Sequence, residues 1–213
     1  MLHLIGWGNT ARARQILENA TGRLDTSRVG YDWFALEMFD RRFEAAFQAL
    51  PDDPGEPQLD RGFIHRLGGN RSAETAALDS ARAHFEGRLE RFSGPGHERH
   101  PERARVLSFL ALAYAGLGME RTALEAGRTA VDIVPVSRDA LEGPRIMERV
   151  ARAHALLGHS EAAVDILAEL VDVHPSEVSR HTLRLDPRYD WLRGDPAFEA
   201  LVEGEPSQPL SGR

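Results

Sequence analysis

Residues 107–135, which read LSFLALAYAGLGMERTALEAGRTAVDIVP, are the most informative stretch of the chain. Small and apolar side chains recur in it every three or four residues on both sides of Gly118. This spacing places them on one face of each of two helices, and alanine at the contact lets two helices approach closely. Gly118 suits the left-handed residue that ends a helix, and Pro135 cannot continue one. The stretch therefore predicts two antiparallel helices joined by a tight turn.

Residues 147–175 repeat this frame, with Gly158 at the turn and Pro175 at the end. The two closing prolines are 40 residues apart (175 minus 135). That is roughly six residues more than a period of about 34. The extra residues fall between Val136 and Pro144, where Gly143-Pro144 should interrupt any helix that begins near Arg138.

Weaker copies of the frame lie upstream. Residues 4–20 match its second half, and residues 64–77 match it with Gly68 at the turn. The second match predicts a long second helix from Ser72 to about Phe92.

Two further segments in the first half of the chain have recognisable patterns. Aromatic and aliphatic side chains at helical spacing in residues 33–50 predict a helical pair, which Pro51-Asp-Asp-Pro54 ends. Residues 93–101 are rich in Gly, Pro and His and predict a linker.

The end of the chain departs from the frame. Asp186-Pro187 and Asp195-Pro196 each pair a helix N-cap residue with a proline suited to the first turn. The apolar residues around them predict a cap that covers the exposed face of the last repeat: Tyr189, Trp191, Leu192, Phe198 and Leu201.

Residues 57–203 resemble the C-terminal tetratricopeptide-repeat (TPR) regions of bacterial serine/threonine kinases, adenylate cyclases and winged-helix regulators. Four segments carry the resemblance: LALAYAGLG at 110–118, AGRTAV at 126–131, PVSRDA at 135–140 and LDPRYDWLRGDPAF at 185–198. The frame at 107–135 keeps the general TPR spacing, W-x2-L-G-x2-Y followed by A-x3-F and a proline. Gly127 is its main departure, because it replaces a bulky aromatic. The resemblance implies a partner-binding or regulatory array. This sequence departs from those proteins because no kinase, cyclase or DNA-binding domain precedes its repeats.

We therefore expect an all-α chain, folded as a right-handed α-α superhelix (a TPR solenoid) of about four to five helix pairs. A single array spans residues 1–204, and a flexible tail follows at 205–213. The array is divided as follows: half repeat 1–27, short degenerate repeat 28–55, repeat with a long second helix 57–93, repeat 101–135, repeat with an insertion 138–175, and C-terminal cap 178–204.

Composition narrows the classes of function. The 213 residues carry 33 acidic and 26 basic side chains, a net charge of −7, and every basic one is arginine. The absence of lysine points to a GC-rich bacterial genome. An acidic chain is repelled by phosphate backbones, so we expect no nucleic-acid partner. No apolar stretch has the length of a bilayer span, no secretory signal is evident and cysteine is absent. We therefore expect no membrane partner and a cytoplasmic location.

Few residues suggest chemistry. His97-Glu-Arg-His100 is the one hint of metal binding, but it lacks the His-Glu-x-x-His spacing and falls in a Gly/Pro loop, so we interpret it as a solvated loop. His154 takes the tyrosine position of the frame and is interpreted as a packed aromatic. No phosphate loop and no nucleophile elbow occur. We expect no catalytic residue, no cofactor and no metal; the remote alternative is an undetected metal-dependent enzyme that uses the histidines.

The expected function is a protein–protein interaction scaffold. Arg145, Arg149 and Arg152 share one helix face by their spacing, and in TPR arrays the first helix of each repeat lines the concave groove. The residues expected to bind a partner segment there are Arg105, Phe109, Leu112, Arg145, Arg149 and Arg152. The expected partner is a protein or peptide, and an acidic one would suit these arginines because their guanidinium groups bind carboxylates. The competing interpretation is a solvated face whose arginines pair with Glu148 and nearby acids.

Two further expectations concern partners. The alternative function is a regulatory TPR fragment that docks onto a separately encoded kinase, cyclase or transcription regulator. An uncapped solenoid end exposes an apolar face, so the half repeat at 1–27 and its neighbours to residue 40 predict a homo-oligomer.

Overall fold

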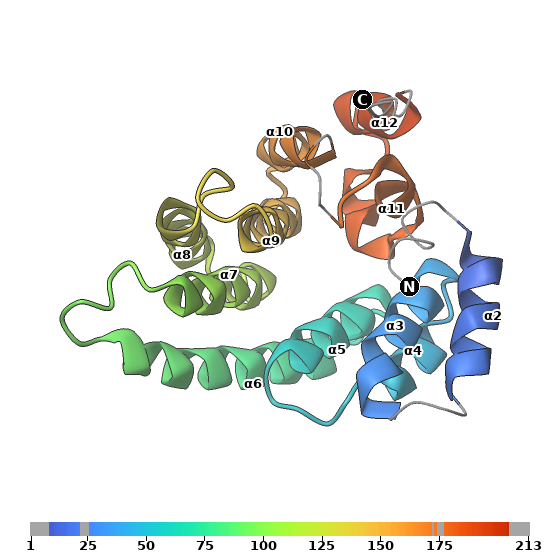
Figure 1. Cartoon of the computed structure of the whole chain (residues 1–213), viewed down its shortest axis with the longest axis horizontal. Coiled ribbons are helices and arrows are strands. Elements are labelled where there is room, and N and C mark those ends of the chain that lie inside the picture. The colour runs from blue at the N-terminus through green and yellow to red at the C-terminus, as the bar shows by residue number, and fades with distance from the viewer. Residues whose placement is uncertain (1–8, 22–25, 172, 174–176, 205–213) are drawn as a thin grey trace, which may run out of the picture.

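The computed structural model describes residues 9–21, 26–171, 173 and 177–204. All regular secondary structure in these ranges is helical, so the prediction of an all-α chain is confirmed. Pro175, Gly8 and the tail at 205–213 lie outside the described residues. The helices shown in Figure 1 are α2 (Thr10–Thr21), α3 (Thr26–Phe39), α4 (Phe43–Ala49), α5 (Glu56–Leu67), α6 (Arg71–Leu89), η1 (Glu90–Phe92), α7 (Pro101–Gly116), α8 (Glu120–Ile133), α9 (Glu142–Leu156), α10 (Ser160–Val171), α11 (Arg180–Leu185), η2 (Pro187–Leu192) and α12 (Pro196–Glu203).

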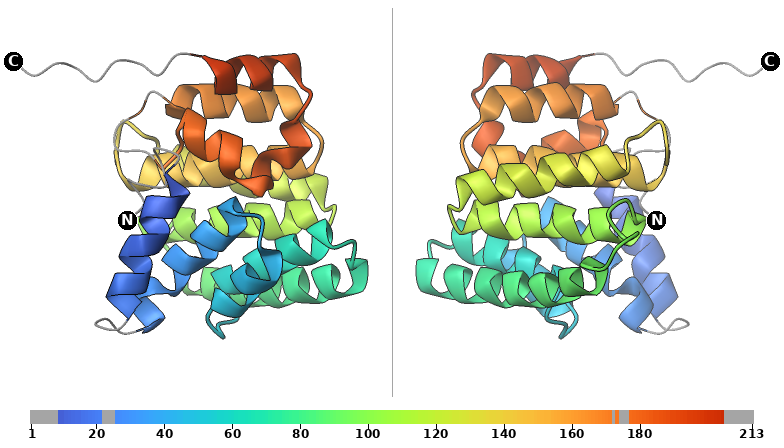
Figure 2. Two further views of the ribbon diagram at one scale, coloured as in Figure 1. Left: turned by 90° about the vertical axis from the view of Figure 1, so that its right-hand side faces the viewer. Right: turned by 90° about the vertical axis from the view of Figure 1, so that its left-hand side faces the viewer.

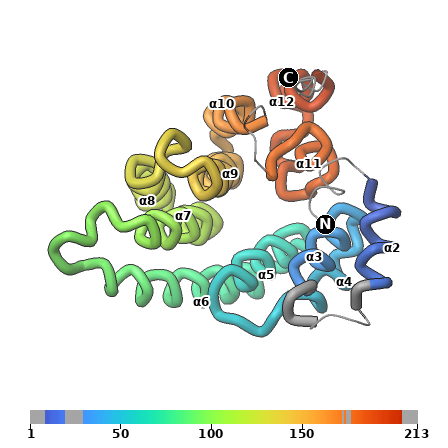
Figure 3. Tube along the Cα trace, in the orientation of Figure 1, coloured from blue at the N-terminus to red at the C-terminus, as the bar shows by residue number. Residues whose placement is uncertain are grey.

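Consecutive helices pack in pairs: α3 with α4, α5 with α6, α7 with α8, and α9 with α10. Neighbouring pairs join because α7 also packs against α6 and α9. The pairs follow an arc in which α5, α7 and α9 lie on the inner side and α6, α8 and α10 on the outer side (Figure 1). Figure 2 shows the same helices as stacked layers. The arc brings α11 back toward α3, as the trace in Figure 3 shows.

Three of the helix pairs turn in the same way. The amide of Met119 donates to the carbonyl of Tyr114 (2.8 Å) and that of Gly118 to Ala115 (3.0 Å). This pair of bonds is the Schellman motif, which needs a left-handed residue that glycine adopts without a Cβ penalty. The turn residues and their φ angles are Gly69 (71°), Gly118 (75°) and Gly158 (80°). The predicted roles of Gly118 and Gly158 are confirmed.

The first of these turns differs from the predicted alignment. The frame predicted Gly68 as the equivalent of Gly118, but Gly68 has a φ of −80° and Gly69 is the left-handed residue. Two adjacent glycines satisfy the pattern equally well, so spacing alone could not separate them. The shift brings Glu74, not Ala73, to the position of Ala123, and Glu74 is buried.

The remaining local predictions agree with the structure except at the insertion. The helix pair predicted at 33–50 is α3 and α4, and the long helix predicted to Phe92 is α6 continued by η1. At the insertion, Gly143 and Pro144 do not interrupt a helix; they form the first turn of α9. A Cβ on Gly143 would lie 2.8 Å from Cα of Val136, so glycine allows the insertion to pack against the start of this helix.

The segment predicted to form a C-terminal cap packs against α10. Asp186 accepts a hydrogen bond from the Arg188 amide, and Asp195 accepts from the amides of Ala197 and Phe198. Residues of α11, η2 and α12 share one buried apolar cluster with α10: Leu167, Leu170, Leu183, Tyr189, Leu192, Phe198 and Val202. Trp191 is the exception, because it is 38% exposed and faces α5 instead.

Candidate functional site

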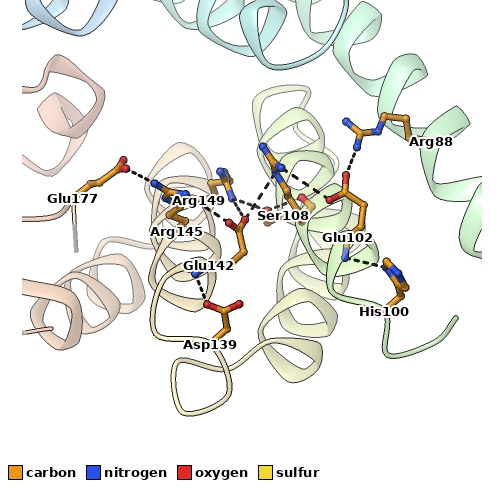
Figure 4. Close-up of polar contacts among 10 residues, drawn as sticks. Arg88, His100, Glu102, Ser108, Asp139, Glu142, Arg145, Arg149 and Glu177 are labelled. Atoms are coloured by element: carbon orange, nitrogen blue, oxygen red, sulfur yellow. Dashed lines mark hydrogen bonds and ion pairs between the residues drawn. The ribbon is translucent and has the colours of Figure 1, made fainter. Parts of the chain in front are cut away.

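The predicted arginine row on α9 runs from an exposed edge into the closed centre of the arc. The side chain of Arg145 is 41% exposed, whereas those of Arg149 and Arg152 are 11% and 12% exposed. Arg105, on the neighbouring helix α7, is 47% exposed. Contacts with Glu142 bring Arg105, Arg145 and Arg149 together at one edge, where Figure 4 shows Arg145 and Arg149 beside Glu142. Arg152 is separated from them because it contacts other acids.

A single carboxylate, Glu142, lies among the three arginines of this edge. Its oxygens are 3.9 Å from Nε of Arg105, 3.9 Å from Nη1 of Arg145 and 3.5 Å from Nη1 of Arg149. Glu142 is in the first turn of α9, where the helix dipole favours a negative charge. Its amide donates to Oδ1 of Asp139 at 2.9 Å. Two neighbouring first helices thus present converging guanidinium groups to one anion.

Further acids flank the arginines, as the competing interpretation predicted; its Glu148 lies beside Arg152, at 3.8 Å, and not at this edge. Glu102 contacts Arg88 and lies 4.0 Å from Arg105. Glu177 accepts a hydrogen bond from Arg145 at 3.0 Å. We call Arg105, Arg145, Arg149 and Glu142 the arginine edge. Its two outer guanidinium groups remain about half exposed and so accessible to a further carboxylate.

Phe109 and Leu112 were expected to offer apolar contacts beside the arginines, but the structure buries both. They are 3% and 4% exposed. The Phe109 ring stacks on Phe85 of α6 with 4.8 Å between centroids, and Arg149 lies 4.2 Å above the same ring. The cause is the position of α7, which packs against α5, α6, α8 and α9. Phe109 therefore supports the arginine edge from below, and neither residue forms part of its surface.

Arg152 belongs to a different cluster at the centre of the arc. Its guanidinium lies 3.8 Å from Glu148 on α9 and 4.0 Å from Asp60 on α5. Asp60 is also 3.9 Å from Arg188 of η2. The Tyr189 hydroxyl donates to Glu148 at 2.7 Å. We call this buried set, completed by Asp186, the central polar cluster.

Three acids share two guanidinium groups in the central polar cluster. Arg188 is held by Asp186 through bonds of 2.6 to 3.0 Å, so Asp60 is left with contacts of 3.9 and 4.0 Å. Desolvation raises the pKa of Asp60 to about 7, although Arg188 and Arg152 oppose the rise. Burial also raises the pKa of Tyr189, and Glu148 adds to it. Burial alone would lower the pKa of Arg188, but Asp186 and Asp60 raise it above its ordinary value.

The central polar cluster was not predicted from the sequence. Asp60 lies between Leu59 and Phe63 on the buried face of α5, where an acid interrupts the apolar pattern. That interruption was the available signal. Its partners come from α9 and η2, which are far away in sequence, so no local spacing could have revealed them.

The histidines among the described residues do not gather at one point. His100 Nδ1 accepts from the Glu102 amide at 3.2 Å as the N-cap of α7, and the rings of His97 and His100 are 6.2 Å apart. Burial, and then His159, lower the pKa of His154. Over the residues that the structure describes, no group of three or more His, Asp or Glu side chains could hold a metal ion. None of the described helices is both long and apolar enough to cross a membrane.

Comparisons with family models, with curated proteins and with solved structures find no match to this chain.

Proposed function

We propose that this chain is a TPR-type protein-interaction scaffold and that its arginine edge binds an acidic segment of a partner protein. Two features support the repeat architecture: the helices follow one another in packed pairs, and three pairs share one glycine-based turn. A chain of this design offers a rigid surface built from neighbouring first helices.

The observation that carries the proposal is the position of Glu142. One carboxylate sits within 3.9 Å of guanidinium nitrogens from Arg105, Arg145 and Arg149. The edge is therefore already shaped around a carboxylate. A partner aspartate or glutamate could join at the exposed sides of Arg105 and Arg145, where charge-assisted hydrogen bonds are available.

The geometry of the arginine edge also limits the expected affinity for a partner. The Arg105 contacts measure 3.9 and 4.0 Å, which exceeds hydrogen-bonding distance. The guanidinium of Arg105 can therefore turn toward a ligand without losing a strong internal bond. Exposed ion pairs contribute about 0.2–1 kcal/mol each, so recognition must come from several contacts and will weaken as salt is added.

The test is an affinity capture from lysate of the source cells, read by mass spectrometry. It compares the wild type with the double variant Arg105→Glu/Arg145→Glu. The matched control is Arg121→Glu/Arg128→Glu, which makes the same charge change at exposed positions on α8. Arg149 and Arg152 are left intact because both are largely buried.

We expect a partner that the wild type and the α8 control retain and that the edge variant loses. Equal retention by all three proteins would keep the scaffold and discard the arginine edge. The alternative, a regulatory fragment that docks onto a separate protein, is favoured if the captured protein is a kinase, a cyclase or a transcription regulator.

A further inference from the structure

One edge of the helix stack carries a row of side chains with alternating charge, which extends the arginine edge on both sides. Each member of the row forms an ion pair with the next. Figure 4 shows the labelled members running from Glu177 on one side to Arg88 on the other. We call this row the charge ladder; its members, in order, are Arg88, Glu102, Arg105, Glu142, Arg145 and Glu177.

The charge ladder lies open to solvent over its whole length. It crosses from α6 through α7 and α9 to the segment before α11, and its six side chains are between 22% and 51% exposed. Arg149 also contacts Glu142, but it is only 11% exposed and adds little to this surface. Three positive and three negative charges make the ladder a neutral strip on a chain whose net charge is −7. Two copies of an acidic chain repel each other least where such a strip faces its counterpart.

The order of the charges makes the ladder complementary to a second copy of itself. It begins with a positive charge and ends with a negative one, so every position meets the opposite sign when the row is reversed. A two-fold axis between Arg105 and Glu142 reverses it in this way, as in an isologous dimer interface. The facing pairs across the axis, each occurring twice, are Arg88 with Glu177, Glu102 with Arg145, and Arg105 with Glu142.

The ladder can accept these facing charges without breaking its own contacts. Three of its five internal contacts measure 3.9 or 4.0 Å, which is longer than a hydrogen bond, so these groups keep donors and acceptors for a partner. The ion pair between Arg41 and Asp190 is the contrast. Arg41 has a φ of 57° in the α3–α4 turn, where three other turns have glycine, and it donates to Asp190 of η2 at 2.6 and 2.9 Å. That pair is satisfied within the chain, whereas the middle of the ladder is not.

An exposed leucine lies at the middle of the ladder. Leu141 directly precedes Glu142 and is 56% exposed, the largest fraction among the exposed large hydrophobic residues of the described chain. Asp139 holds this part of the insertion in place, because its Oδ1 accepts from the amides of Leu141 and Glu142 at 2.9 Å. Insertions in repeat arrays often lie on the binding face. Beside the two-fold axis, Leu141 would meet its own copy and supply an apolar centre inside a polar rim.

From these observations we propose that two copies of this chain associate through the charge ladder as a two-fold dimer, with Leu141 beside the axis. The inference rests on the proposed function in one respect, because Arg105 and Arg145 again bind carboxylates; here the carboxylates belong to a second copy. Self-association and an acidic partner segment therefore compete for the same arginines.

The experiment measures self-association of the purified full-length protein by sedimentation equilibrium over a wide concentration range. Two ladder variants are compared with wild type: Arg88→Glu/Arg145→Glu and Glu102→Arg/Glu177→Arg. Each variant alone places like charges at four of the six facing contacts, whereas a mixed dimer of the two has opposite charges at all six. The control, Arg121→Glu/Arg128→Glu, makes the first variant's charge change at exposed positions on α8. Helicity and melting temperature are compared first.

We expect wild type and the α8 control to dimerise with the same constant. Each ladder variant alone should associate at least tenfold more weakly, because like charges then face each other. An equal mixture of the two ladder variants should regain the wild-type constant as a mixed dimer. A monomeric wild type, unchanged association in either ladder variant, or a mixture that stays monomeric would overturn the proposal.

Crosslinking gives a second test that requires no charge reversal. The chain has no cysteine, so Leu141→Cys introduces a single thiol beside the axis. Mild oxidation should yield a disulfide-linked dimer of this variant and far less of Arg121→Cys, whose thiol would be on the exposed face of α8. Equal crosslinking from the two positions would contradict a contact at the ladder.

Failure of the dimer and failure of the proposed function give different results. Glu102→Arg/Glu177→Arg keeps all three arginines of the arginine edge, so it should still capture an acidic partner from lysate after it has lost self-association. A monomeric wild type that captures a foreign protein through Arg105 and Arg145 refutes the dimer alone. A ladder dimer that captures no foreign protein refutes the foreign partner alone.

Discussion

Asp60 on α5 and Arg188 on η2 lie 3.9 Å apart, with 7% of the Asp60 side chain and 21% of the Arg188 side chain exposed. The distance is too long for a hydrogen bond, because Asp186 holds the Arg188 guanidinium at 2.6 Å. Asp60 is therefore a buried acid whose nearest cation is already engaged. The fold accommodates it more readily as the neutral acid than as the carboxylate.

The first prediction concerns pH. The pKa of Asp60 rises from 3.8 to about 7 on folding, so the folded state binds more protons between these values. Stability therefore falls as pH rises through this window, and the penalty is fully present above pH 7. One pKa unit corresponds to about 1.4 kcal/mol, so the penalty is on the order of 4 kcal/mol. Denaturant unfolding from pH 4 to pH 8 measures it.

The variant Asp60→Asn isolates the contribution of Asp60 to the pH dependence of stability from that of the other titrating groups. It leaves two acids, Glu148 and Asp186, for the two arginines of the central polar cluster. We expect the variant to be close to wild type in stability near pH 4, close to the ordinary pKa of Asp60, where the penalty is small, and to exceed it by a growing margin up to pH 8. A variant that is destabilised equally at both pH values would show that Asp60 is ionised in the folded chain.

A second prediction tests the corrected turn. Gly69 has a φ of 71°, and a Cβ added there would meet no atom within 4 Å, so Gly69→Ala should cost only the left-handed backbone penalty, about 1 kcal/mol. Gly68 has a φ of −80°, so Gly68→Ala should be close to neutral. Urea midpoints of the two variants decide between the registers. The reverse order of stability would restore Gly68 to the turn.

A third prediction concerns the departure at Gly127 from the aromatic of the TPR pattern. A Cβ there would lie 3.2 Å from Val150 on α9, so the close approach of the helices leaves no room for a ring. Gly127→Phe should destabilise the protein by about 1–3 kcal/mol or more through overpacking. Combining it with Val150→Ala should recover part of the loss in thermal melts. Additive losses would mean that Val150 is not the obstacle.

A fourth prediction distinguishes a buried residue that supports the arginine edge from a residue on its surface. Phe109→Ala removes a buried ring and should cost about 3–5 kcal/mol of unfolding free energy. Arg105→Ala removes a half-exposed side chain and should change stability by less than about 0.5 kcal/mol. Chemical denaturation checks both. A small cost for Phe109→Ala would indicate that its ring is accessible after all.

Much of the helical architecture could be predicted from sequence because it depends on local signals. Gly118, Gly158, Asp186 and Asp195 each act within one helical turn, and the structure confirms all four. The exposure of Phe109 could not be predicted in this way. Its burial depends on α6, which approaches from another part of the chain.

The candidate site was predictable only in part, for the same physical reason. Helical spacing correctly places Arg145 and Arg149 on one face of α9, but it cannot report that Arg152 meets Asp60. Arg41 was missed because a turn with Arg in place of Gly carries no local signature. Its role appears only when Asp190 is beside it.

The ion pair between Arg41 and Asp190 has a consequence for how the molecule unfolds. Arrays whose helix pairs contact mainly their neighbours fray from their ends, one unit at a time. Here the ion pair ties the α3–α4 turn to η2, beside the contact between Asp60 on α5 and Arg188 on η2, so two regions far apart in sequence are held together. Amide hydrogens of α3 and η2 should then exchange at matched rates, and losing Arg41 should let the two rates diverge.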